Sequence, residues 1–385
     1  MKRSTDQILT SHVGSLPRPA ELLAKYKKGA SEDDLADDLR QAVADVVKRQ
    51  QDVGIDIVND GEYGKPMSDA VDYGAWQEYA YGRVDGYEVR DAQLSDFSVS
   101  RDFVEFSDYY GTPEAAVASD PDAPVHIGVN VGPVSYARHD LISRDIANLT
   151  AAVGGEADAF LSSMGTGAEA FQLPSEHYAT GEEEMVAMAE AMRDEYKAIT
   201  DAGLIVQIDD PWMVDQFGVK YSHDWDVAGY REWAERHVEI INHSLEGIPS
   251  EQIRFHICWG SWKGPHSSDL PLSDVVDLAL KVNADLYSVE AANPMHEHEW
   301  HVWEDTKLPE NKIIMPGVVT HKTNVLEHPD VVADRIVRYA ELVGRENVIA
   351  GTDCGMGGRI HPDIAWAKLK ALVDGAEIAS KRLWP

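Results

Sequence analysis

Residues 255–260 read FHICWG, a stretch in which His256 and Cys258 stand one residue apart near the end of a short apolar run. The chain has two cysteines, and the other one, Cys354, lies in AGTDCGMGG after a second short apolar run. Glu290 ends a third such run, LYSVE, directly before the turn-forming AANP. One imidazole, two thiols and one carboxylate form a ligand set suited to a soft tetrahedral ion such as zinc.

The same pattern, a short apolar run that ends in a polar residue near Gly or Pro, recurs along the chain. Helical patterns separate many of these runs, and this alternation predicts an α/β fold with a parallel sheet. A (β/α)8 TIM barrel explains the polar run ends, because its chemistry lies on the loops after the carboxyl ends of the strands. Nine runs are candidates for eight strands, and ILTSH and EAFQL are the weakest. The candidates are ILTSH, IDIVNDGE, VHIGVNVGP, AEAFQLP, LIVQIDDPW, RFHICWG, LYSVEAANP, IIMPGVVT and VIAGTDCG.

The clearest helical pattern begins after Ser31, which is followed by the acidic residues EDD and is a good N-cap. Apolar residues then recur at helical spacing, which predicts an amphipathic helix. They are Leu35, Leu39, Val43, Val46 and Val47. Two more helices are predicted around Met185, Met188, Met192 and Tyr196, and around Val331, Ile336, Val337 and Val343.

Residues from about 66 to 122 are rich in Tyr, Asp and Gly and interrupt the alternation of strands and helices. We expect them to be an insertion after the second strand of a single domain that spans residues 1–385. Their tyrosines either pack the insertion or a subunit interface, which is the commoner role of Tyr, or line a cover over the substrate. These are Tyr73, Tyr79, Tyr81, Tyr87, Tyr109 and Tyr110.

Charge and composition exclude several classes of partner. The net charge of −33 argues against nucleic acid and against an anionic membrane surface. No apolar run reaches the roughly 18 residues of a membrane span, and the start of the chain has no signal-peptide pattern. With two cysteines, too few for a disulfide framework, the expected location is the cytoplasm. The oligomeric state stays open, a homo-oligomer included.

Each of the four candidate ligands is a weak signal alone, because a lone Cys is usually a small core residue and a lone His is often just hydrogen-bonded. Together they are specific, since His256 and Cys258 share one face of a strand and a barrel would bring Glu290 and Cys354 to the same mouth. A carboxylate such as Glu290 can instead support the ligands from outside the first shell. The nearby HEHEWH, residues 296–301, lacks HExxH spacing and is predicted to be a solvated or hydrogen-bonding segment.

These residues resemble the cobalamin-independent methionine synthases, specifically their zinc-bearing C-terminal barrel. The resemblance runs in order through GSLPRP, NDGE, QIDDP, HIC, VEAANP and GTDCG, and so covers most of the chain. It implies that zinc is bound by His256, Cys258, Glu290 and Cys354. It also implies a clamp for the amino-acid part of a thiol such as homocysteine, made by Gly14, Ser15, Glu62 and Asp209.

The chain departs from that family in three places. It has room for one barrel where the longer enzymes have two, QIDDP replaces QIDEP, and VVTHK stands where the family has VYDIH. The proton-donating His of the family would fall on Lys322, with His321 one place earlier. The resemblance therefore implies that His321 or Lys322 is the general acid that protonates the leaving group.

The expected function is a zinc-dependent methyltransferase that activates a homocysteine-like thiol for attack on a methyl donor such as a methylated folate. The first alternative is a thiol alkyltransferase that resembles epoxyalkane:coenzyme M transferase, whose sulfonate would need Arg18, Lys65, Lys322 or Arg359 in the pocket. The second is a non-catalytic barrel with a structural or sensory zinc. Structural sites usually draw ligands from closely spaced loops, whereas these ligands are spread over 256–354.

Overall fold

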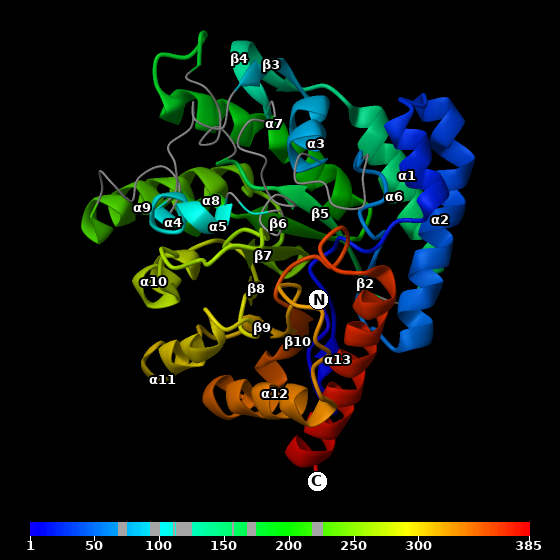
Figure 1. Cartoon of the computed structure of the whole chain (residues 1–385), viewed down its shortest axis with the longest axis vertical. Coiled ribbons are helices and arrows are strands. Elements are labelled where there is room, and N and C mark those ends of the chain that lie inside the picture. The colour runs from blue at the N-terminus through cyan, green and yellow to red at the C-terminus, as the bar shows by residue number, and fades with distance from the viewer. Residues whose placement is uncertain are drawn as a thin grey trace.

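The barrel is seen in a computed structural model of the chain (Figure 1). The structure describes residues 1–67, 75–92, 101–110, 112, 125–155, 158–167, 175–217 and 226–385. In this part of the chain, eight parallel strands follow one another in the order β1-β10-β9-β8-β7-β6-β5-β2. They are β1 (Leu9–Thr10), β2 (Val58–Asn59), β5 (Ala159–Met164), β6 (Ile205–Asp210), β7 (Ile253–Ile257), β8 (Leu286–Val289), β9 (Ile313–Val319) and β10 (Ile349–Thr352).

The two edge strands of this sheet meet each other. The backbone amides of Asp56 and Ile57, just before β2, donate to the carbonyl oxygen of Thr10 in β1 at 3.2 and 3.1 Å. These bonds join the first strand of the chain to the second, so the curled sheet closes. The predicted (β/α)8 TIM barrel is confirmed.

Helices cover the outside of the sheet, and the longest lie along its outer surface (Figure 1). Ser31 caps α2 as predicted, because its side chain accepts from the amide of Asp34, and all five predicted apolar positions of this helix are buried. The predicted second and third helices are α7 and α12. The helices between the strands are α1 (Ala20–Lys27), α2 (Glu32–Val53), α6 (His139–Val153), α7 (Gly181–Asp201), α8 (Trp212–Gln216), α9 (Val227–Ser244), α10 (Val276–Ala279), α11 (Val302–Asp305), α12 (Pro329–Val343) and α13 (Pro362–Leu383).

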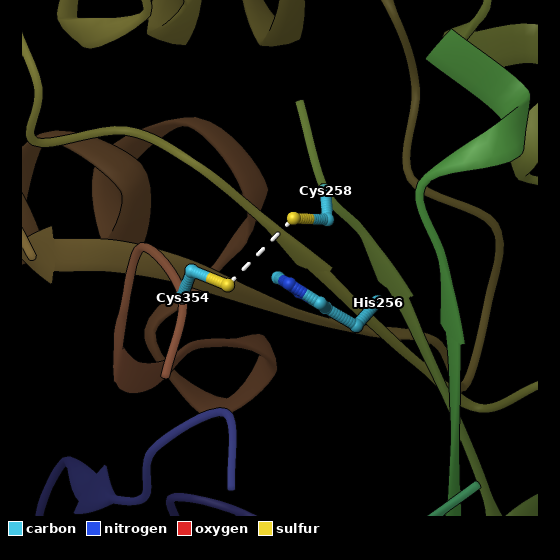
Figure 2. Close-up of side chains that lie close together, drawn as sticks. All are labelled: His256, Cys258 and Cys354. Carbon is cyan, nitrogen blue, oxygen red and sulfur yellow. Dashed lines mark hydrogen bonds between the residues drawn. The ribbon is translucent and has the colours of Figure 1, made fainter. Parts of the chain in front are cut away.

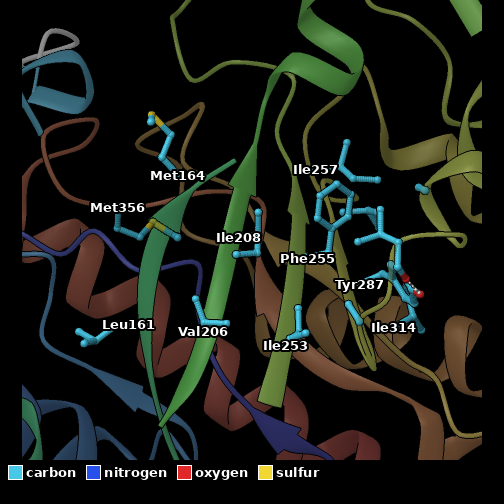
Figure 3. Close-up of a cluster of buried hydrophobic side chains, with 14 of the residues drawn as sticks. Leu161, Met164, Val206, Ile208, Ile253, Phe255, Ile257, Tyr287, Ile314 and Met356 are labelled. Carbon is cyan, nitrogen blue, oxygen red and sulfur yellow. Dashed lines mark hydrogen bonds between the residues drawn. The ribbon is translucent and has the colours of Figure 1, made fainter. Parts of the chain in front are cut away.

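The strands send alternate side chains to two cores. One lies between the sheet and its helices, and Figure 3 shows part of it, with Val206, Ile208 and Phe255 among the labelled residues. The other fills the lower interior of the barrel and includes Phe160, Ile205 and Ile349. Because the side-chain period of a strand is two, the residues that follow Ile205 on its own face are Gln207 and Asp209. The inner row of a strand thus leads from apolar core to polar mouth.

Two strand predictions were wrong. VHIGVNVGP lies in β4 (Val125–Tyr136), which pairs antiparallel with β3 (Val84–Ala92) in a separate two-stranded sheet and is not a barrel strand. The barrel strand β5 (AFLSSM) was missed, because its two serines hide a run that is buried at every position. The weak candidate ILTSH does contain a barrel strand, β1, whereas AEAFQLP lies outside the described residues.

The segment 66–122 contains regular structure where the structure describes it, namely α3 (Ala75–Arg83), β3, α4 (Arg101–Glu105) and α5 (Ser107–Tyr110). Tyr79 is buried, and its hydroxyl donates to Glu195 of α7. Tyr136 of β4 donates to the other oxygen of the same carboxylate at 2.5 Å. Tyr79 thus links the segment to the barrel, and Tyr73 lies outside the described residues. None of the helices in the described ranges is long and apolar enough to cross a membrane.

Candidate metal centre

Three of the four predicted ligands come together at the carboxyl-terminal mouth of the barrel. One potential ligand atom each from His256, Cys258 and Cys354 lie within 4.8 Å of one another. His256 belongs to β7, Cys258 follows that strand, and Cys354 follows β10, which lies three places away in the sheet. Figure 2 shows the three side chains converging, with the two Sγ atoms 3.6 Å apart. Both cysteines are free thiols.

The ring of His256 has the arrangement expected of a metal ligand. Its Nδ1 is 3.0 Å from the hydroxyl of Ser288 on β8, whereas its buried Nε2 has no hydrogen-bond partner among the residues that the structure describes. Burial, aided by the nearby Arg254 charge, lowers the pKa of His256 to about 3, so the ring is neutral and keeps a lone pair. Metal-binding imidazoles are usually oriented by such a bond through the other ring nitrogen. The residues therefore fit a soft cation.

Without a metal, the Cys258 thiol is hard to ionise. The adjacent Cys354 thiol and burial raise the pKa of Cys258 well above its usual range. A divalent cation reverses this preference, because a coordinated thiol is deprotonated at neutral pH. A cation bound between the two thiols would therefore turn them into anionic ligands.

Glu290, the predicted fourth ligand, lies beside this trio but outside the group of atoms that cluster within 4.8 Å. It is fully buried, with Oε1 accepting from the amide of Trp259 at 3.2 Å and Oε2 accepting from Asn293 Nδ2 at 2.7 Å. Burial raises the pKa of Glu290 to about 7. In this geometry the carboxyl group fixes the loop that follows Cys258.

A second group, which we call the acid side, lies on the loops and ends of other strands. Glu62 follows β2, Asp209 belongs to β6, and both side chains are buried. Lys65 Nζ lies 3.4 Å from Glu62 Oε1, and Gln207 Nε2 donates to Asp209 Oδ1 at 2.6 Å. Burial, followed by the charge of Glu62, raises the pKa of Asp209 well above its usual range. The two predicted acids thus lie close enough for the charge of one to act on the other.

Gly14 touches the acid side directly. A Cβ atom at this position would lie 2.5 Å from Glu62 Oε1 and from Ser162 Oγ, and the backbone has a φ of +127°, so only glycine fits. The Gly14 amide donates to His12 Nδ1 at 3.2 Å. The carbonyl oxygen of Ser15 accepts from the amides of Met356 and Gly357, which joins it to the loop that carries Cys354.

Asp210 points the other way. Its Oδ2 atom lies 2.6 Å from Nε2 of His237 on α9, and both side chains are fully buried outside the barrel. Consecutive residues of a strand face opposite sides, so the sequence pair Asp209–Asp210 divides between the mouth and the helical layer.

The two candidate acids, His321 and Lys322, differ in their surroundings. His321 is fully buried, and within the described part of the chain neither of its ring nitrogens has a hydrogen-bond partner. Burial, with help from the Lys322 charge, lowers the pKa of His321 well below its ordinary value. Lys322 Nζ instead donates to the carbonyl oxygen of Gly260 at 2.6 Å and lies 2.9 Å from His266 Nε2. The lysine is therefore held by the protein, whereas the imidazole has hydrogen-bonding capacity to spare.

A family model described as "Cobalamin-independent synthase, Catalytic domain" matches residues 114–378, well over half of the chain. The chain belongs to this family. It is thus a member of an enzyme family, and the resemblance drawn from HIC, VEAANP and GTDCG is confirmed at the level of the family.

Curated relatives align along almost the whole chain. The 2-hydroxypropyl-CoM lyase of Xanthobacter autotrophicus is 24% identical, and the alignment covers 98% of this chain and 96% of that protein. The methionine synthase of Sulfolobus acidocaldarius is also 24% identical, with 97% and 93% covered. The 5-methyltetrahydropteroyltriglutamate–homocysteine methyltransferase of Vibrio parahaemolyticus matches 97% of this chain, which spans 42% of that enzyme's length.

Solved structures of family members have the same fold. A B12-independent methionine synthase from Shewanella, in complex with selenomethionine, superposes with a TM-score of 0.73 over 98% of this chain and 99% of its own, at 22% identity. A putative vitamin-B12 independent methionine synthase from Listeria monocytogenes gives a TM-score of 0.64 at 19% identity, over 97% and 98% of the two chains.

Two buried residues beside the candidate metal centre, Asp353 and Asn293, were missed by reasoning from the sequence. Asp353 Oδ1 accepts from the amides of Ala291 and Ala292 at 2.7 and 2.9 Å, and its Oδ2 accepts from Asn293 at 3.3 Å. This carboxylate ties the loop after Glu290 to the loop of Cys354. Asn293 stands in VEAANP and Asp353 stands in GTDCG, but only Glu290 and Cys354 of these motifs were predicted to be ligands. A polar residue next to a candidate ligand was the available signal.

Proposed function

We propose that the chain is a zinc-dependent transferase that moves a methyl group to a homocysteine-like thiol, with a methylated folate as the donor. The observation that carries the proposal is the convergence of His256, Cys258 and Cys354, with the buried Nε2 of His256 unpartnered. A bound zinc ion would lower the pKa of the substrate thiol and so present it as the nucleophilic thiolate. The chain spans 42% of the length of the Vibrio methyltransferase, so the activity of that whole enzyme is proposed for this chain and is not inferred from the alignment alone.

The acid side would bind the amino-acid part of the thiol. Glu62 and Asp209 lie close enough to interact, and an ammonium group bound by both would replace the present partners Lys65 and Gln207. Charge-assisted bonds of this kind are short and strong. The amides near Gly14 and Ser15 would accommodate the carboxylate, and this requires the Gly14 amide to turn from His12.

His321 is the stronger of the two candidates for the proton donor. Its ring nitrogens have no protein partner, whereas Lys322 already donates to the protein. Because burial keeps its pKa low, the ring would gain its proton as an anionic methyl donor binds beside it. The proton would then pass to the nitrogen of the donor as the methyl–nitrogen bond breaks and the carbon–sulfur bond forms.

Glu290 would be the fourth zinc ligand until the substrate thiol binds. Its present bonds to Trp259 and Asn293 would then hold the carboxylate close by when the thiol displaces it. X-ray absorption of the zinc-loaded protein tests this directly. An oxygen ligand replaced by sulfur on addition of homocysteine supports the exchange, and an unchanged shell refutes it and favours a structural or sensory zinc.

The decisive test of activity combines zinc-loaded protein, homocysteine and a series of methylated folates. Formation of methionine supports the proposal, and the C258S variant is the matched control that should form none. Absence of methionine and of any thioether with every donor would refute the methyltransferase assignment.

A thiol alkyltransferase that uses a sulfonate-bearing thiol is the second candidate, and Lys65 favours it. This buried lysine brings positive charge to the acid side, next to Glu62, where an anionic head group could bind. The Xanthobacter relative, aligned over nearly the full length of both chains, supports the same candidate. The thiolate would attack an epoxide carbon, and the alkoxide released by ring opening would take up a proton. Turnover of coenzyme M with an epoxide, and none with homocysteine, would select this candidate.

A further inference from the structure

A chain of buried titratable side chains lies next to the metal centre and takes no part in the proposed chemistry. It begins at Glu299, whose Oε2 is 2.9 Å from Nδ1 of His296. Nε2 of His296 is 3.0 Å from Asp269 Oδ2, and the same oxygen is 2.9 Å from Nδ1 of His266. Nε2 of His266 is 2.9 Å from Lys322 Nζ. The four acidic and imidazole side chains are buried.

We propose that Glu299, His296, Asp269 and His266 form a positioning chain that fixes the Lys322 ammonium beside the metal ligands. The inference rests on the proposed zinc centre, but it concerns the binding of the metal and not the transfer of the methyl group. The positioning chain also gives HEHEWH a role. His296 of that segment is buried and is one of the four members, whereas His301 is exposed and pairs with Glu304.

Asp269 sets the tautomer of His266. A carboxylate oxygen only accepts, so His266 Nδ1 must carry the hydrogen that lies between them. Nε2 lies 2.9 Å from Lys322 Nζ and 3.0 Å from the carbonyl oxygen of Trp262, and in the neutral ring, with its hydrogen on Nδ1, it accepts from the lysine. His296 holds Asp269 in place from the other side. Burial lowers the pKa of His296, but its bonds to Asp269 and Glu299 outweigh burial and raise that pKa to about 10, so it stays cationic.

His266 is kept at this position at a conformational cost. Its backbone is in the left-handed region with φ of +55°, which L-residues other than Gly rarely adopt. Such strain persists where the surrounding structure fixes a residue for a purpose. Here the ring of Trp262 stacks on the ring of His266 with centroids 4.1 Å apart, and Lys322 Nζ lies 2.9 Å from Nε2 of His266.

The charge of the metal centre explains why a fixed cation is useful there. Two cysteine thiolates and the Glu290 carboxylate carry one more negative charge than zinc neutralises, and an incoming thiolate would add another. Lys322 is anchored to the carbonyl oxygen of Gly260, two residues after Cys258, so its charge lies close to this excess. Outside the first shell, groups that support a metal site commonly change its affinity by about 10- to 100-fold.

The test is zinc affinity, measured by competition with a chromophoric chelator on the full-length protein. Lys322→Met and Asp269→Asn should each weaken zinc binding by roughly tenfold, and Lys322→Arg should restore most of the loss. If Asp269 acts through Lys322, the double variant should be no weaker than Lys322→Met alone, because coupled residues are not additive. Additive losses, or an unchanged affinity in Lys322→Met, would overturn the inference.

The matched control is His237→Gln, which breaks another fully buried His–Asp pair, with Asp210, outside the barrel. It should leave zinc affinity unchanged even if it lowers the melting temperature. If Asp269→Asn does not fold, His266→Leu replaces it, and the same double-variant comparison decides. Normal zinc binding in the wild type without any methyl transfer would count against the proposed function alone. If His237→Gln lost as much zinc affinity as Asp269→Asn, the effect of the positioning chain would be one of general stability only, and the inference would be refuted.

Discussion

The two sides of the barrel mouth satisfy their polar groups in opposite ways. On the metal side, made by His256, Cys258 and Cys354, the imidazole Nε2 has no partner and the two sulfur atoms face each other. On the acid side, Glu62 faces Lys65 and Asp209 accepts from Gln207. Buried polar groups are costly unless paired, so the metal side would gain from a bound cation, whereas the two carboxylates of the acid side already have partners in the protein.

This difference indicates how each side would respond to a ligand. Binding of an ion would give the metal side new bonds and would cost it only the weak contact between the two thiols. The acid side exchanges one set of partners for another, so its binding energy is a difference between similar terms. Substitutions should therefore have larger effects on the metal side than on the acid side.

The largest effect is expected for Cys258→Ser. Loss of one thiolate should remove zinc at stoichiometric loading and lower kcat/KM for thiol methylation by roughly a thousandfold, about 4 kcal/mol of transition-state stabilisation. Metal analysis by plasma mass spectrometry and steady-state kinetics measure the two changes. Retained zinc with full activity would show that the metal side is not the catalytic centre.

Asp209→Asn should weaken the acid side without emptying the metal side. Hydrogen bonds to charged groups contribute about 1.5–3 kcal/mol, so we expect KM for homocysteine to rise about 10- to 100-fold while zinc content stays constant. Kinetics on zinc-loaded variants give the result. The neighbour Asp210→Asn, which faces His237, is the control and should not change KM; an equal effect in both variants would contradict the division between them.

Asp60, whose Oδ1 accepts from the Glu62 amide, should make the acid side sensitive to pH. Burial, then the Asp145 charge, raises the pKa of Asp60 from its ordinary value of 3.8 to about 7. The folded protein therefore holds this proton longer than the unfolded chain, and stability falls as pH rises from about 4 to 7. Asp60→Asn should remove about 2 kcal/mol of that fall, as measured by urea unfolding at pH 5 and pH 8. An unchanged difference between these two pH values would refute it.

The smallest effect is expected from Ser288→Ala, which removes the group that orients His256 through Nδ1. Loss of such an orienting bond should weaken zinc binding by about tenfold, or 1.4 kcal/mol, with the ligands themselves intact. Chelator competition measures it, and Ser163→Ala, on β5 and bonded to Glu195, is a control that should leave zinc affinity unchanged. A loss as large as that of Cys258→Ser would mean that the ring cannot stay in place without Ser288.

The sequence by itself determined the barrel, the capped helix α2 and the metal trio. Each rests on short-range rules: strand ends marked by polar residues and Gly or Pro, helical spacing after Ser31, and the period of two that puts His256 and Cys258 on one face. These rules cannot separate two structures that produce the same local sequence pattern. An alternating run such as VHIGVNV fits a barrel strand and a hairpin strand alike, and its antiparallel partner β3 is chosen by packing.

Only the tertiary structure decided which polar atoms meet across strands. Asp353 bonds the loop after Glu290, His266 reaches Lys322, and Asp209 and Asp210 part to the two sides of β6. Such contacts join residues up to 62 positions apart, and their geometry depends on the curvature of the closed sheet. Chemical type along the chain thus named the candidate metal ligands, but the pairing of the other charges at the mouth followed from distances that exist only once the barrel has closed.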